Sequence, residues 1–297
     1  MRGNLSRLTH DRRHYVFGTA LVTVLAALLG PSLAMATPKG EFAVFADCPL
    51  TTASTCLYAK TESGKFIVGK ETVPIEKAIT LQGGLNANEK GELTFVAAAD
   101  GNTLSKTPQK VPGGLAGLVK CNEIGNFLER LACEVVFENG VTGVNATSEL
   151  AAPASSIGVN LANYLFQSGT ALSLPLKVHL ENPFLGSSCY IGSNSSPIIV
   201  NLTTGTTAPP PPNTSITGSP GTEEGKGENE ILAFSKNSLV NNSFAAPGAN
   251  GCGGLFAFLI DPIVNSKLGL PSAAGKNTAV LNGIEELASS EAVKKHE

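Results

Sequence analysis

Short runs in which apolar and polar or small residues alternate recur along the chain. In the run 41–47, for example, Phe42 and Val44 alternate with Ala43 and Phe45. A period of two is typical of β-strands with one buried face. Alternation and the turn signals that bound it predict strands at residues 41–47, 65–70, 72–81, 91–99, 132–138, 141–150, 173–181, 197–203 and 277–287.

Apolar residues spaced three or four apart predict two helices. The first is a short amphipathic helix over 122–131, and the second covers 253–268, the most apolar stretch after the leader, with Pro262 expected to kink or restart it. The second helix is expected to cover the core, or alternatively to act as a hydrophobic lid or partner surface. Residues 160–166 fit either a helical turn or an extended segment.

Together these elements predict a mainly β fold, an antiparallel β-sandwich-like domain with one or two short α-helices. The domain is expected over residues 37–290, with a polar tail at 291–297. Asn139 and Gly140 predict a tight hairpin. Residues 208–227 are rich in proline and glycine and are expected to form an exposed extended excursion from that single domain.

The leader Met1–Ala36 has the three parts of a secretory signal peptide. Four arginines precede an apolar run, Pro31 breaks it, and Ala34 and Ala36 provide the small residues for cleavage after Ala36. The mature chain is therefore expected to be secreted, extracellular or associated with the cell envelope, with no membrane span left after cleavage. Arg12 and Arg13 keep both the general secretory and the twin-arginine export routes open.

All six cysteines lie after the leader, in a chain expected to reach an oxidising space where disulfides persist. Six cysteines allow fifteen pairings, so the sequence alone does not select one. Closeness along the chain favours Cys48–Cys56, Cys121–Cys133 and Cys189–Cys252. The cysteines have no C-x-x-C spacing, and His179 and His296 are the only histidines after the leader, so redox and zinc sites are disfavoured.

No catalytic motif is recognisable, and we predict no catalytic, cofactor-binding or metal-binding residue. His179 is expected to be a partly solvated strand residue on the side opposite Val178 and Leu180. Its functional alternative is a general base for Ser187, Ser188 or Ser193. The glutamates are interpreted as lying on solvated faces or in turns, so no paired carboxylates for glycosidase chemistry are expected.

Composition limits the partners. Arg130 is the only arginine after the leader, and the whole chain has a net charge of −3, so nucleic-acid binding is disfavoured. Tryptophan is absent and aromatic residues make up 6% of the chain, which disfavours a carbohydrate-binding groove. A cell-wall or surface component is a candidate partner.

Residues 179–192 read HLENPFLGSSCYIG. Here the chain resembles uncharacterised secreted proteins of actinobacteria, which carry a similar stretch after an export signal. The resemblance extends loosely over the mature chain, including residues 42–56 and 252–255. It implies an exported protein and supplies no activity or catalytic residues.

These observations favour an exported, non-enzymatic structural or binding protein of the extracellular space or cell envelope. One alternative is a secreted hydrolase with a dispersed active site near His179. Another is a carrier of an apolar ligand, in which the helix at 253–264 covers a cavity lined by Phe256, Phe258 and Leu259.

Overall fold

The computed structural model describes residues 37–114, 125–133 and 143–297. The predicted signal peptide, the hairpin at Asn139 and Gly140, and Cys121 with its predicted pairing to Cys133 fall outside these residues.

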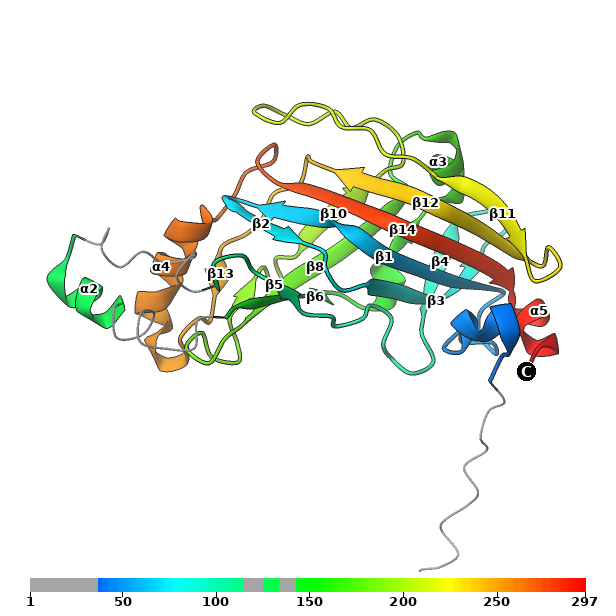
Figure 1. Cartoon of the computed structure of the whole chain (residues 1–297), viewed down its shortest axis with the longest axis horizontal. Helices are drawn as coiled ribbons and strands as arrows, with labels where there is room; N and C mark the ends of the chain where they lie inside the picture. The colour runs from blue at the N-terminus through cyan, green and yellow to red at the C-terminus, as the bar shows by residue number, and fades with distance from the viewer. Residues whose placement is uncertain (1–36, 115–124, 134–142) are drawn as a thin grey trace, which may run out of the picture. The chain divides into compact units, whose positions relative to one another are not determined.

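The first sheet, sheet A, is antiparallel and has the strand order β11-β12-β14-β1-β3-β4, with β2 paired to the end of β1 (Figure 1). Its strands are β1 (Thr55–Val68), β2 (Glu71–Pro74), β3 (Ile79–Ala87), β4 (Leu93–Ala97), β11 (Thr222–Lys226), β12 (Ile231–Asn241) and β14 (Thr278–Ser289). The predicted strands at 65–70, 91–99 and 277–287 thus belong to this sheet, with shifted ends, whereas the single strand predicted at 72–81 is divided between β2 and the start of β3. Gly83 and Gly84, which follow the strand predicted at 72–81, lie inside β3.

The second sheet, sheet B, is centred on β8 and is also antiparallel. Its strands are β5 (Gln109–Lys110), β6 (Asn145–Leu150), β7 (Gly158–Val159), β8 (Leu172–Glu181), β9 (Tyr190–Ile191), β10 (Ile198–Leu202) and β13 (Ala249–Asn250). The predictions for 173–181 and 197–203 are confirmed, because β8 and β10 match them closely.

The main hydrophobic core lies between the two sheets. It contains Leu57, Phe95 and Phe234 from sheet A, and Leu174 and Val200 from sheet B. The coarse fold prediction is therefore confirmed: the protein is mainly β, sandwich-like, with two antiparallel sheets and few short helices.

The described helices are short. They are α2 (Phe127–Cys133), α3 (Leu161–Phe166), α4 (Ala257–Leu268) and α5 (Ser290–Lys295), with 3-10 turns η2 (Gly40–Phe45), η5 (Ala154–Ser156) and η6 (Gly254–Phe256). At α3, the Asn160 side chain accepts a hydrogen bond from the Asn163 backbone N–H at 2.9 Å, an N-cap that selects the helical form of this ambiguous segment. None of the helices in the described part of the chain has the length and apolar character needed to cross a membrane.

The prediction of a strand at 41–47 is wrong, because residues Gly40–Phe45 form the 3-10 turn η2. Phe42 and Phe45 are both buried, in a second, smaller core with Ile231 and Val293. Residues three apart lie on the same side of a 3-10 turn, whereas a strand would place them on opposite faces. The alternation in this run is therefore coincidental.

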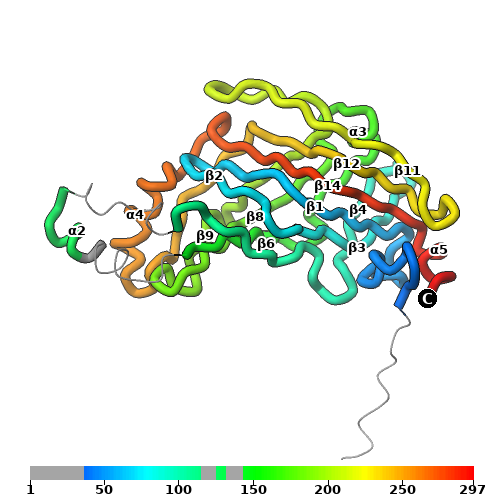
Figure 2. The backbone as a smooth tube through the Cα atoms, viewed as in Figure 1, coloured from blue at the N-terminus to red at the C-terminus, as the bar shows by residue number. Residues whose placement is uncertain are grey.

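The polar tail expected at 291–297 is also different in the structure. Ser290–Lys295 form α5, which is capped by Ser289 and buries Val293 completely. The Lys39 backbone N–H donates to the His296 carbonyl oxygen at 2.9 Å, so the first and last residues that the structure describes lie together (Figure 2). The two ends therefore stabilise each other. The sequence of either segment alone does not reveal this contact.

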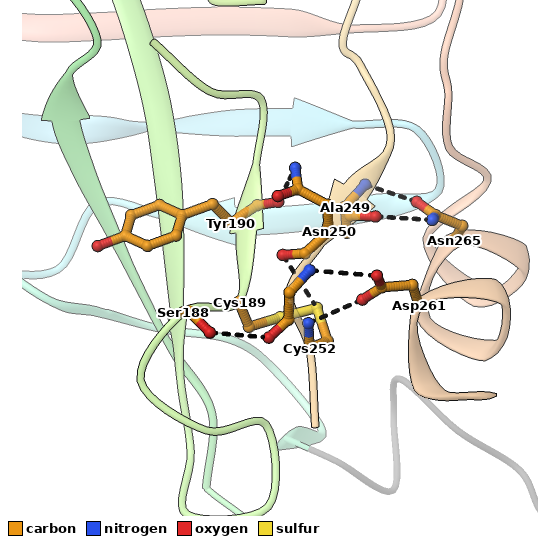
Figure 3. Close-up of a disulfide and its surroundings, with 9 residues drawn as sticks. Ser188, Cys189, Tyr190, Ala249, Asn250, Cys252, Asp261 and Asn265 are labelled. Carbon is orange, nitrogen blue, oxygen red and sulfur yellow. Dashed lines mark hydrogen bonds between the residues drawn. A yellow bond between two sulfur atoms is a disulfide. The ribbon is translucent and has the colours of Figure 1, made fainter. Parts of the chain in front are cut away.

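Two of the predicted disulfides are present, Cys48–Cys56 and Cys189–Cys252, with sequence separations of 8 and 63 residues. Loop-closure entropy gives contributions of roughly 2.5 and 4 kcal/mol. Both bridges are in keeping with an oxidising environment. In Figure 3 the second bridge lies beside Asp261 of α4, whose carboxylate accepts the backbone N–H groups of Gly251 and Cys252 at 3.1 and 2.7 Å.

The excursion at 208–227 is mostly exposed, as predicted, but it is tied to the domain. The Asn213 side-chain amide donates to the carbonyl oxygens of Asn242 and Asn277, at 2.9 and 3.0 Å. Its last residues form β11 at the edge of sheet A.

Candidate functional site

Two cavities lie between the sheets. Cavity 1 has a volume of about 70 Å³ and cavity 2 of about 60 Å³, both measured for the centre of a water-sized sphere. In this measure a single water needs about 10–15 Å³, so each cavity has room for several waters or for part of a narrow chain. Phe66, Ser148 and Leu176 line both cavities and form the partition between them. Most of the other lining side chains are apolar.

Cavity 1 follows from the side chains that meet on the inner face of sheet A. Leu81, Ala59, Glu285 and Phe234 are consecutive cross-strand partners on β3, β1, β14 and β12. Ala59 is small, so this row leaves space beside the carboxyl group of Glu285. Leu81, Ala59 and Glu285 all line the cavity.

A β-bulge places a second polar group at this cavity. The register of β12 against β14 shifts between Ser235 and Asn237, and Lys236 within the bulge has a φ of 58°. A bulge adds one residue and changes which side chains face inward. Asn237 is buried and lines cavity 1 as a result.

Tyr164 of α3 completes a buried polar cluster, which we define as Tyr164, Asn237 and Glu285. The Tyr164 hydroxyl donates to the Pro220 carbonyl oxygen at 3.0 Å and accepts from the Asn237 side-chain amide at 3.1 Å. Its ring packs edge-on against Phe234 with centroids 5.2 Å apart. The cluster therefore joins α3, β12 and β14 with the excursion around Pro220.

Burial raises the pKa of Glu285 to about 7, because the charged carboxylate loses its hydration inside the core. A hydrogen bond with Tyr164 acts in the opposite direction and lowers the pKa of Glu285. Burial also raises the pKa of Tyr164, so its hydroxyl keeps its proton.

The polar groups that line cavity 2 are either bonded to the backbone or only partly buried. Gln109 is fully engaged with the backbone, accepting from Glu76 and Lys77 and donating to the Lys77 and Thr107 carbonyl oxygens. Partial burial raises the pKa of Glu71, which also lines this cavity. Cavity 1 is the one that presents a cluster of buried polar side chains.

His179 lies on the outer face of sheet B, as the alternation of β8 predicted. Its Nδ1 is 3.5 Å from the Glu181 carboxylate, and its ring stacks on Tyr190 with centroids 4.5 Å apart. Its Nε2 is buried and has no hydrogen-bond partner among the described residues. An open groove of about 560 Å³ runs past His179 and Ser187.

The three serines proposed as partners of His179 do not form a catalytic pair with it in the described part of the chain. Ser188 donates its hydroxyl to the Gly251 carbonyl oxygen at 3.1 Å (Figure 3). Ser193 is 3.1 Å from the hydroxyl of Ser195. Ser187 lines the groove beside His179, without a hydrogen bond to it.

The helix α4 buries one side and exposes the other. Ile260, Val264 and Leu268 are buried, as expected for a core-covering helix. In contrast, the expectation that Phe256, Phe258 and Leu259 line a cavity is wrong, because these side chains are 63%, 72% and 40% exposed and line neither cavity. The cavities lie between the sheets, and from α4 only Leu268 reaches one of them, cavity 2.

Sequence reasoning missed Glu285, which it grouped with solvated glutamates. The signal was available, because Leu281, Glu285 and Leu287 occupy the same side of a strand that was correctly predicted. Two adjacent glutamates in a strand must face opposite ways, so one of Glu285 and Glu286 had to face the core.

Among residues 37–114, 125–133 and 143–297, no group of three or more histidine, cysteine, aspartate or glutamate side chains is placed to hold a metal ion. Comparisons with protein-family models, with curated proteins and with solved structures give no match to this chain.

Proposed function

We propose that the protein is an exported, non-enzymatic binding protein that holds an apolar ligand between its two sheets. The observation that carries the proposal is the pair of apolar cavities, which share Phe66, Ser148 and Leu176 as their partition. Rotation of these side chains would join the cavities into one channel. Ligand sites are commonly concave and apolar with a few polar groups, as cavity 1 is.

Export is part of this proposal. It is supported by the leader sequence, by the two disulfides and by the resemblance to secreted proteins of actinobacteria. A carrier for apolar molecules has a clear use outside the cell, because such molecules are poorly soluble in water.

The polar side chains also favour binding over catalysis. Glu285 is the one carboxyl group among the described residues that line cavity 1, because the adjacent Glu286, also buried, lies on the other face of sheet A and pairs with Lys226 at 2.5 Å. Acid–base cleavage of a glycosidic bond uses two carboxyl groups facing one substrate. A buried acid beside a tyrosine and an amide is better suited to orienting a ligand head group.

The proposal is tested with diphenylhexatriene, an elongated hydrocarbon whose fluorescence rises when it leaves water. We expect saturable binding to the wild-type protein. Ser148→Leu fills the partition between the cavities and should weaken binding at least about tenfold, since an added apolar side chain occupies the ligand's space.

Thr94→Leu is the matched control, because it adds similar apolar volume at an exposed position of β4. It should leave binding unchanged. Absence of saturable binding, or equal binding by Ser148→Leu and Thr94→Leu, would show that the space between the sheets is not a ligand site.

A further inference from the structure

We propose that cavity 1 takes a single-chain amphiphile with a protonated amine head group, and that Glu285 is the counter-ion of this amine. The inference rests on the proposed function and adds the chemical class of the ligand. It is drawn from the hydrogen bonds and charges around Glu285 and from the narrowness of the two cavities.

The hydrogen-bonding groups of the cluster leave an acceptor for the ligand. The Tyr164 hydroxyl has a single proton, which can serve either the Pro220 carbonyl oxygen or one oxygen of Glu285, and the Asn237 amide donates to Tyr164. At least one oxygen of the Glu285 carboxyl group is therefore left as a strong acceptor at the cavity. A ligand head group that donates hydrogen bonds therefore fits, and an anionic head group is repelled.

The charges of the side chains around cavity 1 also favour a cationic head group. The titratable groups that line it are Lys60, Tyr164 and Glu285. Lys60 is the one cation among these three, and its Nζ is 2.8 Å from Glu62, so it already has a carboxylate partner. The strand neighbours of Glu285 are Ala59 and Phe234, which carry no charge. Glu285 is thus a buried acid for which the cavity lining supplies no free cation.

A protonated amine would supply both the positive charge and the hydrogen-bond donors for the Glu285 carboxylate. Burial of an unpaired carboxylate is costly, and an adjacent cation with good hydrogen-bond geometry offsets much of that cost. The alkyl chain of the ligand would extend along the apolar lining toward Phe66, Ser148 and Leu176. Because both cavities are small, a single elongated chain fits better than two chains.

Proton release follows from this pairing. Since burial raises the pKa of Glu285 to about 7, the carboxyl group is largely protonated at pH 6 in the free protein. Formation of the ion pair requires the carboxylate, so an alkylammonium ligand should expel a proton on binding at that pH. A neutral alcohol should bind without proton release.

The test uses decylamine, decanol and decanoic acid as probes, which share one chain and differ in the head group. Isothermal titration at pH 6, in two buffers with different protonation enthalpies, gives the affinity and the number of protons released. We expect decylamine to bind at least about tenfold more tightly than decanol, with release of about one proton, and decanoic acid to bind weakest.

Glu285→Gln separates the head-group inference from the proposed function. It should weaken decylamine binding at least about tenfold, abolish proton release and change decanol binding little. Ser148→Leu should weaken all three probes and thereby controls for adsorption at the surface.

If decylamine and decanol bind equally to the wild type, or if Glu285→Gln leaves the preference unchanged, the head-group inference is wrong and the apolar site stands. If neither these probes nor diphenylhexatriene binds, the proposed function fails together with the inference.

Discussion

Glu285 and Glu286 are neighbours in β14 whose side chains face opposite sides of sheet A. Glu285 points into the core and lines cavity 1, whereas Glu286 pairs with Lys226 on the outer face. Both side chains are buried, and the two environments differ in charge. Glu286 has a lysine partner, whereas burial raises the pKa of Glu285 and no described residue lining cavity 1 provides a free cation beside it, which makes Glu285 suitable for a cationic ligand.

The first prediction concerns the pH dependence of stability. The pKa of Glu285 is raised from 4.5 to about 7 in the folded state. Its favourable contribution to the free energy of unfolding is therefore fully present below pH 4.5 and is lost as the pH rises through 7. At pH 8 the ionised form should cost about 3 kcal/mol. Glu285→Gln should therefore raise the free energy of unfolding by up to that amount at pH 8, and by little at pH 4.5.

Urea unfolding followed by circular dichroism across this range measures the effect. Glu286→Gln is the matched control, because it loses the ion pair with Lys226 but keeps Glu285. Its free energy of unfolding should change with pH as in the wild type between pH 4.5 and 7. A flat difference between Glu285→Gln and the wild type over this range would show that Glu285 has the same pKa in the folded and the unfolded protein.

A second prediction concerns Tyr164. Tyr164→Phe removes the donor to the half-buried Pro220 carbonyl oxygen and the acceptor of the buried Asn237 amide, so both groups lose this partner. We expect a loss of about 1–3 kcal/mol in the free energy of unfolding. The pKa of Glu285 should rise further, because the hydrogen bond from Tyr164 lowers it.

Carbon-detected NMR titration of the glutamate carboxyl groups reports the pKa of Glu285 directly. Tyr190→Phe serves as the control, since Tyr190 stacks on His179 on the outer face of sheet B, away from the cluster. An unchanged Glu285 titration in Tyr164→Phe would contradict the hydrogen-bonded cluster.

A third prediction concerns Gly283. This residue pairs with Thr61 of β1 and with Asn237 of β12, and both strands have a register shift there. A Cβ at this position would collide with the Lys60 carbonyl oxygen. Gly283→Ala should therefore destabilise the protein by more than about 2 kcal/mol.

The matched control is Gly143→Ala, which adds the same methyl group where no described atom lies within 4 Å. Thermal unfolding of both variants makes the comparison. Equal melting temperatures would show that the close approach at Gly283 is relieved by small shifts of the strands.

A fourth prediction concerns the disulfides. Replacement of both cysteines by serine should cost about 4 kcal/mol for the pair Cys189 and Cys252 and about 2.5 kcal/mol for Cys48 and Cys56, following the lengths of the loops that they close. Denaturant unfolding under non-reducing conditions gives both values. The reverse order would show that packing around each bridge outweighs loop entropy.

The strands were predictable where one pattern extends over the whole element. β8 and β14 are long, alternate clearly and were found within a few residues of their ends. The segments η2 and α5 were missed, because Phe42 and Val293 are buried in a small core that brings the two segments together with Ile231 of β12. Burial of this kind depends on tertiary contacts and leaves no periodic pattern of apolar residues in the local sequence.

The candidate site was less predictable than the fold. Asn237 reaches cavity 1 through a bulge, and Tyr164 reaches it from a six-residue helix. Neither position is marked by composition or by spacing from Glu285. The cavity itself arises from side-chain volumes on two facing sheets, with the small Ala59 next to Glu285, and a single sequence does not show which residues face each other across the core.

The central claim is that a chain-like amine occupies the space between the sheets. Its most direct test is a crystal structure of the protein grown with decylamine brominated at the end of its chain, with the bromine located by anomalous scattering. The account predicts the nitrogen within hydrogen-bond distance of the Glu285 carboxylate and the bromine beyond it between the two sheets. Bromine found only on the outer surface, with cavity 1 unchanged, would contradict it.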